Sequence, residues 1–181
     1  MIERMIGKKA PYFDMKTVDG SGKSFGRVTL DDYRGKWLVL FFYPLDFTFV
    51  CPTEITGFNR RMKDFENLNG AILGVSTDSE HSHKAWINTS IDQGGLGQLK
   101  FPLASDMTQK TARDYGVLIE EDGIALRGLF VIDPEGILKY SVVHDLNVGR
   151  SVDETIRVLQ ALQSGGLCPI DWSPGEEHLN G

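Results

Sequence analysis

The chain has 181 residues, a formal net charge of −6 and a pI near 5.2. This acidic balance, with basic residues scattered along the chain, argues against nucleic acid or an anionic membrane as a partner. The composition is that of a soluble single-domain protein, without an apolar run near the roughly 20 residues of a membrane span. The first residues carry no signal-peptide pattern, so we expect a cytoplasmic protein.

The N-terminal part of the chain predicts three strands and then a helix. Residues 12–18 and 24–30 alternate polar and apolar side chains around an Asp-Gly-Ser-Gly turn, which predicts an N-terminal β-hairpin. The continuous apolar run at residues 37–43 is typical of a central strand covered on both faces. Apolar residues at three- and four-residue steps predict one helix over residues 52–68.

The middle of the chain alternates between strands and helices. Residues 71–75 and 101–104 are predicted as strands, and residues 79–88 and 108–115 as helices. Gly116 follows the second of these helices at a position that favours a left-handed C-cap.

The C-terminal part predicts a hairpin, a helix and a tail. An Asp-Pro-Glu-Gly turn joins strands expected at residues 127–132 and 137–143. The last helix is expected over residues 152–163, beginning with a capping box formed by Ser151 and Glu154.

The whole order predicts an α/β sandwich of mixed strands. We expect a single domain in two parts. Residues 1–164 form the folded body, and residues 165–181, rich in Gly, Pro and charge, form a mobile tail.

Cys51 and Cys168 are the two cysteines of the sequence. One pair is too few for a disulfide-stapled scaffold, and in a reducing cytosol such a pair is more often catalytic or inert. The four histidines stand at no ligand spacing from a cysteine. We therefore expect neither a metal nor a flavin or haem cofactor, because two sulfurs can carry redox chemistry alone.

The chemistry is expected around Cys51, where a strand and a loop end and a helix begins with Pro52. Free backbone N–H groups and the positive end of the helix dipole stabilise a thiolate there. A thiolate attacks peroxide oxygen and becomes a sulfenic acid. The hydroxyl of Thr48 is close enough in sequence to reach the sulfur or the peroxide, and Pro44 offers an apolar surface that shields the sulfur from water.

The run Pro44-x-x-x-Thr48-x-x-Cys51 resembles the active-site signature of the peroxiredoxins, and Phe-Thr-Phe-Val-Cys-Pro-Thr-Glu is typical of their two-cysteine branch. The likeness covers nearly the whole chain. Further matching segments, in the same order, are residues 94–97, 127–133, 148–154 and 168–169. The resemblance implies a thioredoxin-like fold, with a mixed central sheet flanked by helices.

The resemblance also implies the site residues. Pro44, Thr48, Cys51 and Arg127 would form the active site, Glu54 would orient an arginine network, and Arg150 would be its second arginine. A permanently charged guanidinium can stabilise the thiolate and offset charge on the leaving oxygen. Without the resemblance, these residues would be a strand end, a loop hydroxyl, a buried thiol and ordinary surface charges.

The implied activity is reduction of hydrogen peroxide and organic hydroperoxides. The Cys51 sulfenic acid would condense with Cys168 of the partner subunit, and thioredoxin or a flavoprotein disulfide reductase would reduce the disulfide. A homodimer is implied, with a decamer of five dimers left open. The helix start must unwind, because a buried thiol cannot reach disulfide geometry in place.

Peroxide-sensitive members of the family combine a Gly-Gly-Leu-Gly loop with a Tyr-Phe pair in a C-terminal helix. This sequence has the loop but no such pair, so we expect resistance to overoxidation. A thioredoxin-type dithiol oxidoreductase is disfavoured, because no second cysteine follows Cys51 at Cys-x-x-Cys spacing. A redox-regulated holdase chaperone or signalling scaffold stays open as the alternative function.

Overall fold

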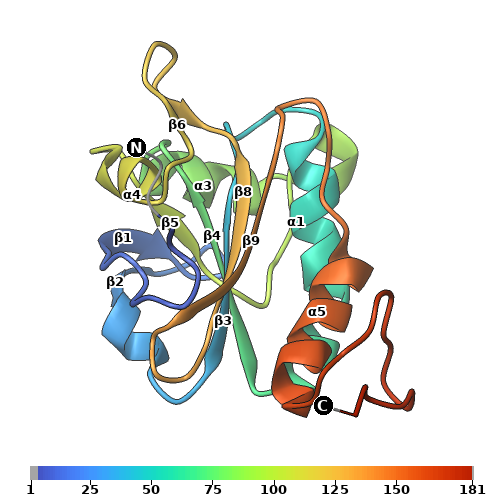
Figure 1. The fold of residues 1–181 in the computed structure, drawn as a ribbon. Coiled ribbons are helices and arrows are strands. Elements are labelled where there is room, and N and C mark those ends of the chain that lie inside the picture. The colour runs from blue at the N-terminus through green and yellow to red at the C-terminus, as the bar shows by residue number, and fades with distance from the viewer. Residues whose placement is uncertain (1–3, 181) are drawn as a thin grey trace.

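The computed structural model describes residues 4–180, which form one mixed seven-stranded sheet with helices on both faces (Figure 1). The central strand β3 (Trp37–Phe42) pairs in parallel with β4 (Gly70–Ser76) and antiparallel with β8 (Arg127–Ile132). The outer strands are β5 (Leu103–Ser105), β1 (Asp14–Val18) and β2 (Phe25–Thr29) beyond β4, and β9 (Leu138–His144) beyond β8. The predicted fold class, a mixed central sheet flanked by helices, is confirmed.

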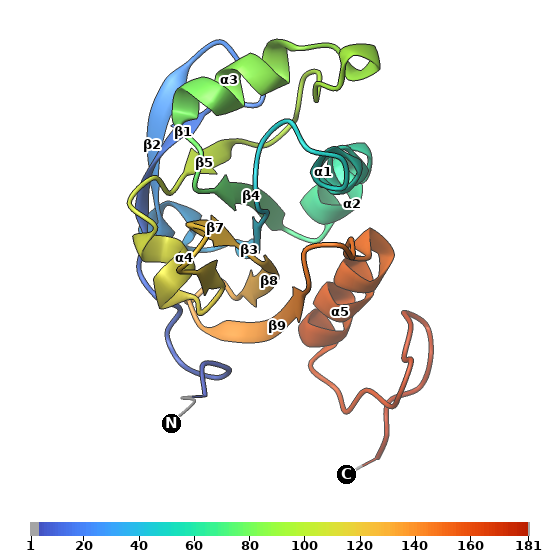
Figure 2. The same cartoon turned by 90° about the horizontal axis from the view of Figure 1, so that it is seen from above.

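The core lies on both faces of β3, as its unbroken apolar sequence predicts. Val39 and Phe41 face the cluster under α1 (Cys51–Arg60), whereas Leu40 and Phe42 face the opposite cluster. On the first face α1 is joined by α2 (Met62–Asn67), α3 (Glu80–Asn88) and α5 (Val152–Ser164). The short helix α4 (Lys110–Asp114) covers the other face (Figure 2). Within residues 4–180, no helix is long and apolar enough to cross a membrane.

The helix expected over residues 52–68 is two helices, so that prediction is wrong in one respect. The chain leaves helical geometry at Arg61 (φ −98°, ψ 10°) and starts again at Met62. Hydrophobic spacing could not reveal this break, because Met62 and Phe65 still point into the core after it. The Arg61 side chain bridges Asp64 and Asp153 on the neighbouring α5.

Other differences concern short elements. The helix expected from residue 108 begins at Lys110, because Gln109 is left-handed (φ +61°) and Asp106 caps the helix from further upstream. Gly116 is left-handed, as predicted. Short strands β6 (Leu118–Ile119) and β7 (Ile124–Ala125), not foreseen, form a separate hairpin. Two single turns of 3₁₀-helix, at Leu30–Tyr33 and Ile91–Gln93, were also not foreseen.

The start of α5 confirms half of the predicted capping box. The Ser151 hydroxyl accepts the backbone N–H of Glu154 at 3.1 Å, as an N-cap should. The Glu154 carboxylate does not return to Ser151 but pairs with Arg157, one turn further along α5. A bidentate arginine partner within reach outcompetes a single backbone N–H.

The tail after α5 is irregular but folded back on itself rather than extended. Gly165 is left-handed (φ +70°) and ends the helix. An isolated β-bridge then joins Leu167 to Leu179. Within the loop that this bridge closes, the side chain of Trp172 is buried. The division of the chain at residue 164 and the mobility of this tail stay predictions.

Candidate active site around Cys51

Cys51 is the first residue of α1, and its side chain is fully buried, with 0% of its surface exposed. Strand β3 ends at Phe42, residues 43–50 form a loop, and Val50 is the N-cap of the helix. The prediction that the thiol stands at or near a helix N-cap, with Pro52 in the first turn, is confirmed. The sulfur therefore lies where unpaired backbone N–H groups concentrate positive charge.

Arg127 brings a permanent positive charge to this thiol. It is the first residue of β8 and is buried. Its Nη1 donates to the Cys51 sulfur at 3.3 Å and to Glu54 Oε2 at 2.8 Å, while its Nε donates to the Leu146 carbonyl at 2.7 Å. Because three acceptors hold the planar guanidinium, it cannot move away from the sulfur without breaking strong hydrogen bonds.

Glu54 connects this arginine to a second one. Its carboxylate accepts from Arg127 and also from the backbone N–H, Nε and Nη2 of Arg150, at 2.6, 2.8 and 2.9 Å. Arg150 is held from the other side, since its Nη1 donates to the carbonyls of Phe42 and Gly128. The structure thus brings together the predicted glutamate and both predicted arginines.

The network also fixes the charge on Glu54. Burial alone would raise the pKa of the carboxyl, but the hydrogen bonds and charge of Arg150, with the charge of Arg127, outweigh burial and hold the pKa of Glu54 below its usual value. Glu54 is therefore ionised at neutral pH and neutralises one of the two buried guanidiniums. The remaining positive charge is free to act on the sulfur.

Thr48 and Pro44 lie in the loop between β3 and α1. Pro44 is buried, whereas Thr48 is partly exposed. The Thr48 hydroxyl donates to the Leu45 carbonyl at 3.0 Å, so its own hydrogen is not directed at the sulfur. Its oxygen lone pairs remain able to accept a hydrogen bond.

The loop is anchored by a buried cluster that the sequence analysis did not identify. The Asp46 carboxylate accepts from Tyr43 Oη at 2.8 Å and from Ser82 Oγ at 2.7 Å, and lies 2.8 Å from His83 Nδ1. His83 Nε2 lies 2.9 Å from the carbonyl of Ala104, which can only accept. The sequence signal that could have pointed to this cluster is Asp46, three residues after Tyr43 at the end of a strand.

The protonation of His83 follows from these partners. Burial alone would lower the pKa of the imidazole, but the Asp46 carboxylate outweighs burial and raises the pKa of His83 above its usual value. Both ring nitrogens face acceptors, so the protonated ring donates to both. A buried ion pair between α3 and the loop thus holds the segment that precedes Cys51.

Cys168 is a free thiol, partly buried in the tail. Its sulfur lies 3.7 Å from the carbonyl of Ala161 in the last turns of α5. Arg150, just before the start of α5, contacts Glu54, and the 13 residues of α5 rise by about 20 Å. The structure therefore does not bring the two thiols of one chain together, and the start of α1 and the tail lie at opposite ends of the molecule (Figure 1).

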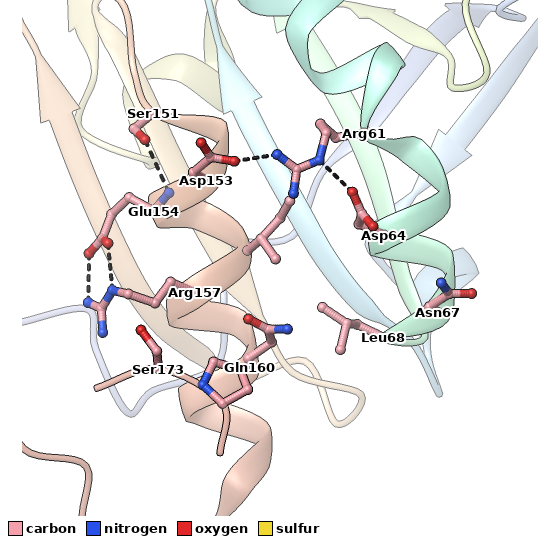
Figure 3. Close-up of a pocket in the computed structure, with 12 residues that line it drawn as sticks. Arg61, Asp64, Asn67, Leu68, Ser151, Asp153, Glu154, Arg157, Gln160 and Ser173 are labelled. Carbon is pink, nitrogen blue, oxygen red and sulfur yellow. Dashed lines mark hydrogen bonds and ion pairs between the residues drawn. The ribbon is translucent and has the colours of Figure 1, made fainter. Parts of the chain in front are cut away.

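A hollow of about 640 Å³ on the surface does not touch Cys51. It lies between α2, α5 and the tail, and Figure 3 shows that its charged side chains turn toward one another. Arg61 pairs with Asp64 and Asp153, and Arg157 pairs with Glu154. Among residues 4–180, no cluster of His, Cys, Asp or Glu is arranged to hold a metal ion.

Comparison with known proteins adds to this geometry. The sequence matches the model of the AhpC/TSA family over residues 6–141. It is 62% identical over 178 residues to a protein of the rubredoxin operon of Clostridium pasteurianum, covering 98% of this chain and 100% of that protein. It is 54% identical over 168 residues to a mitochondrial thioredoxin-dependent peroxide reductase of Drosophila melanogaster, covering 91% of this chain and 72% of the reductase.

Among solved structures, the reduced 2-Cys peroxiredoxin of Plasmodium vivax matches with a TM-score of 0.94 and 40% identity, over 97% of this chain and 93% of that one. The matches in sequence and in fold extend over almost the whole chain. The chain therefore belongs to the AhpC/TSA family and is a peroxiredoxin, that is, a thiol peroxidase.

Proposed function

We propose that Cys51 is the thiol that attacks the peroxide, and the contact from Arg127 Nη1 to its sulfur at 3.3 Å carries this proposal. A buried guanidinium beside the sulfur and at a helix N-terminus favours the thiolate over the thiol. Hydrogen peroxide and organic hydroperoxides are the substrates, because the thiolate needs only a weak O–O bond to attack.

The first step transfers one oxygen atom. The Cys51 thiolate attacks the nearer peroxide oxygen, an S–O bond forms, the O–O bond breaks, and the leaving hydroxide or alkoxide takes up a proton. Arg127 stabilises the negative charge that develops on the oxygens. The Thr48 oxygen accepts a hydrogen bond from the peroxide O–H, which orients it, and Pro44 keeps water from the sulfur.

The second step uses Cys168 of the partner subunit. The two thiols of one chain lie at opposite ends of α5, which supports a resolving thiol from a second copy. Strand β9 is an outer strand of the sheet. Its first residue, Leu138, bonds to the backbone of Gly7 and Lys8, and the edge beyond Leu138 suits pairing with a second copy in a homodimer. Five such dimers would make the decamer that the family resemblance suggests.

The two thiols can meet only if α1 opens. A disulfide needs Cα atoms about 4.4–6.8 Å apart, whereas Cys51 is fully buried beneath its loop. The first turn of α1 therefore unwinds after oxidation and presents the sulfenic acid. Attack by the Cys168 thiolate forms the disulfide and releases water.

An external dithiol completes the cycle. The Drosophila relative is named for its dependence on thioredoxin, which supports a thioredoxin-like reductant here, with a flavoprotein disulfide reductase as the other source of electrons. We place this enzyme in the cytoplasm, whose reducing conditions keep thiols such as Cys51 and Cys168 free between turnovers. No cofactor of the chain itself takes part in this cycle.

The test uses the reduced protein and one equivalent of hydrogen peroxide, followed by intact mass and a non-reducing gel. The native chain should become a disulfide-linked dimer. Cys168→Ser should instead retain one oxygen on Cys51, and Cys51→Ser should consume no peroxide. Two free thiols in the native chain after this treatment would refute the proposal.

A holdase role is the second candidate, supported by an exposed apolar group in the loop before α1. Leu45, Phe47 and Phe49 all expose large apolar side chains, and Phe49 is 95% exposed. Such a patch binds other apolar surfaces, either of another subunit or of an unfolded client. Protection of an aggregating client by Cys51→Ser, lost in Phe49→Ser, would show that this role is independent of the peroxidase.

A further inference from the structure

The thiol of Cys168 ends a short chain of hydrogen-bonding groups. Its sulfur lies 3.4 Å from Ser164 Oγ, and Ser164 Oγ lies 3.0 Å from Nε2 of His178. We propose that Ser164 and His178 stabilise the thiolate of Cys168 and so speed disulfide formation. Ser164 touches the reacting sulfur, and His178 is a positioning residue that acts through Ser164.

The fold of the tail places the imidazole for this role. Its ring stacks on the ring of Trp172, with centroids 5.2 Å apart and an interplanar angle of 19°. Trp172 is only 4% exposed, and Arg157 on α5 donates to its carbonyl at 2.8 Å. The Leu179 N–H donates to the Leu167 carbonyl at 2.8 Å, which closes the tail into a loop around Cys168.

Gly166 makes room for the imidazole. A Cβ atom at this position would lie 2.3 Å from Cδ2 of His178, far inside van der Waals contact. The ring therefore rests directly on the backbone of Gly166, whose own N–H points to Ser164 Oγ at 3.4 Å. An alanine at this position must push the ring away from Ser164.

The hydrogen bonds allow the sulfur to change its charge. With a thiol, the Ser164 hydroxyl donates to the Ala161 carbonyl at 2.8 Å, and its oxygen is available to the S–H. With a thiolate, the hydroxyl can turn to donate to the sulfur. The oxygen is then supported by the N–H groups of His178 and Gly166. Loss of the thiol proton to water is therefore compensated locally.

Charged groups around this cluster come from both elements that form it. On α5 these are Glu154 and Arg157, which pair with each other. On the tail they are Asp171, Glu176 and Glu177, of which Glu176 accepts the N–H of Ser173 at 2.8 Å. Within residues 4–180, the hydrogen-bond partner of the imidazole is Ser164. The sulfur itself contacts Ser164 Oγ at 3.4 Å and, at 3.7 and 3.8 Å, the carbonyls of Ala161 and Gly166, and the imidazole acts on it through Ser164.

This inference rests on the proposed role of Cys168 as the resolving thiol. In that step the Cys168 thiolate attacks the sulfenic sulfur of the partner subunit's Cys51, an S–S bond forms and the S–O bond breaks. Cys168 is oxidised, the sulfenic sulfur is reduced, and the departing hydroxide takes a proton to become water. A larger thiolate fraction at Cys168 raises the rate of this attack.

The experiment measures Cys168 alone. In a Cys51→Ser background the chain has a single thiol, and its alkylation by iodoacetamide is followed from about pH 5.5 to about pH 9. His178→Phe keeps an aromatic ring for the stack but has no nitrogen. His81→Phe, an exposed histidine on α3 that contacts Phe25, is the matched control.

We expect His178→Phe and Ser164→Ala each to slow alkylation at neutral pH by about three- to tenfold, and to move the rate profile to higher pH. Gly166→Ala, which keeps Cys168, Ser164 and His178 themselves unchanged, should also slow alkylation and move the rate profile to higher pH. His81→Phe should change nothing. Profiles for His178→Phe and Gly166→Ala that coincide with the Cys51→Ser parent would overturn the inference.

A second readout separates this inference from the proposed function. With Cys51 intact, disulfide formation after one equivalent of peroxide should be slower in His178→Phe than in the native chain. If the native chain forms no disulfide while the alkylation profiles still differ, the resolving role is wrong but the activated thiol stands. If disulfide forms at equal rates and the profiles coincide, the inference alone is wrong.

Discussion

The two cysteines of this chain occupy opposite kinds of environment. Cys51 is fully buried, contacts a guanidinium and lies beside a carboxylate that accepts four hydrogen bonds. Cys168 lies in an irregular tail, where its sulfur has only long contacts of 3.4–3.8 Å. The difference fits the roles proposed for the two thiols, because a thiol that attacks peroxide needs fixed geometry, whereas a thiol that resolves the product must be free to move.

The largest expected effect comes from breaking the buried network at Glu54. Glu54→Gln leaves two buried guanidiniums without a counter-ion, and we expect a loss of about 3–5 kcal/mol in the free energy of unfolding. Urea unfolding measures it. The control Glu154→Gln, at a partly exposed pair on α5, should cost less than about 1 kcal/mol. If Glu54→Gln and Glu154→Gln lost the same unfolding free energy, the surroundings of Cys51 would be no more rigid than the surface.

The ionisation of Glu54 should also make the free energy of unfolding depend on pH. Because the pKa of the carboxyl is lowered in the folded chain, its contribution to stability is complete above its usual value of 4.5. That contribution should disappear as the pH falls through the lowered value. The native chain should therefore lose more stability than Glu54→Gln on acidification, and parallel acid-unfolding curves for the two would contradict this.

The next effect concerns the contact between arginine and sulfur. Arg127→Met removes the charge beside Cys51 while keeping an apolar stem, and we expect peroxide to react about 100- to 1,000-fold more slowly. Peroxide consumption under single-turnover conditions measures the rate. The control Arg113→Met removes an exposed arginine that pairs with Glu120, and it should react at the native rate.

A smaller effect is expected at the loop anchor. His83→Gln removes the imidazole that pairs with Asp46, at a cost of about 1–3 kcal/mol. Because the pKa of His83 is raised, its contribution is complete below about pH 6.5 and is lost as the pH rises through the raised value. The difference in unfolding free energy between native and variant should therefore shrink in alkali. His144→Gln, at a partly exposed histidine, is the control.

The smallest effect is expected at Cys168. Cys168→Ser should leave the free energy of unfolding within about 0.5 kcal/mol of the native value, because the thiol makes no strong contact. Urea unfolding of the reduced proteins measures it. A loss comparable to that of Glu54→Gln would show that the tail is as firmly built as the active site.

The sequence predicted what depends on local chemistry. A strand end, a short loop and Pro52 placed Cys51 at a helix start, and the apolar run before it predicted the central strand. Arg127, 76 residues from Cys51, was named only through the family resemblance, because no local pattern shows which strand end will face the sulfur. Asp46 and His83 were missed for the same reason, since their contact exists only once α3 packs beside the loop.

The break at Arg61 has a consequence for cooperativity. It makes α1 a unit of ten residues, followed by a helix whose Phe65 stays locked in the core. Arg61 itself is tethered to α5. Fraying that starts at Cys51 can therefore stop at this joint, so the opening proposed for the oxidised chain would involve a small foldon instead of the whole helical layer.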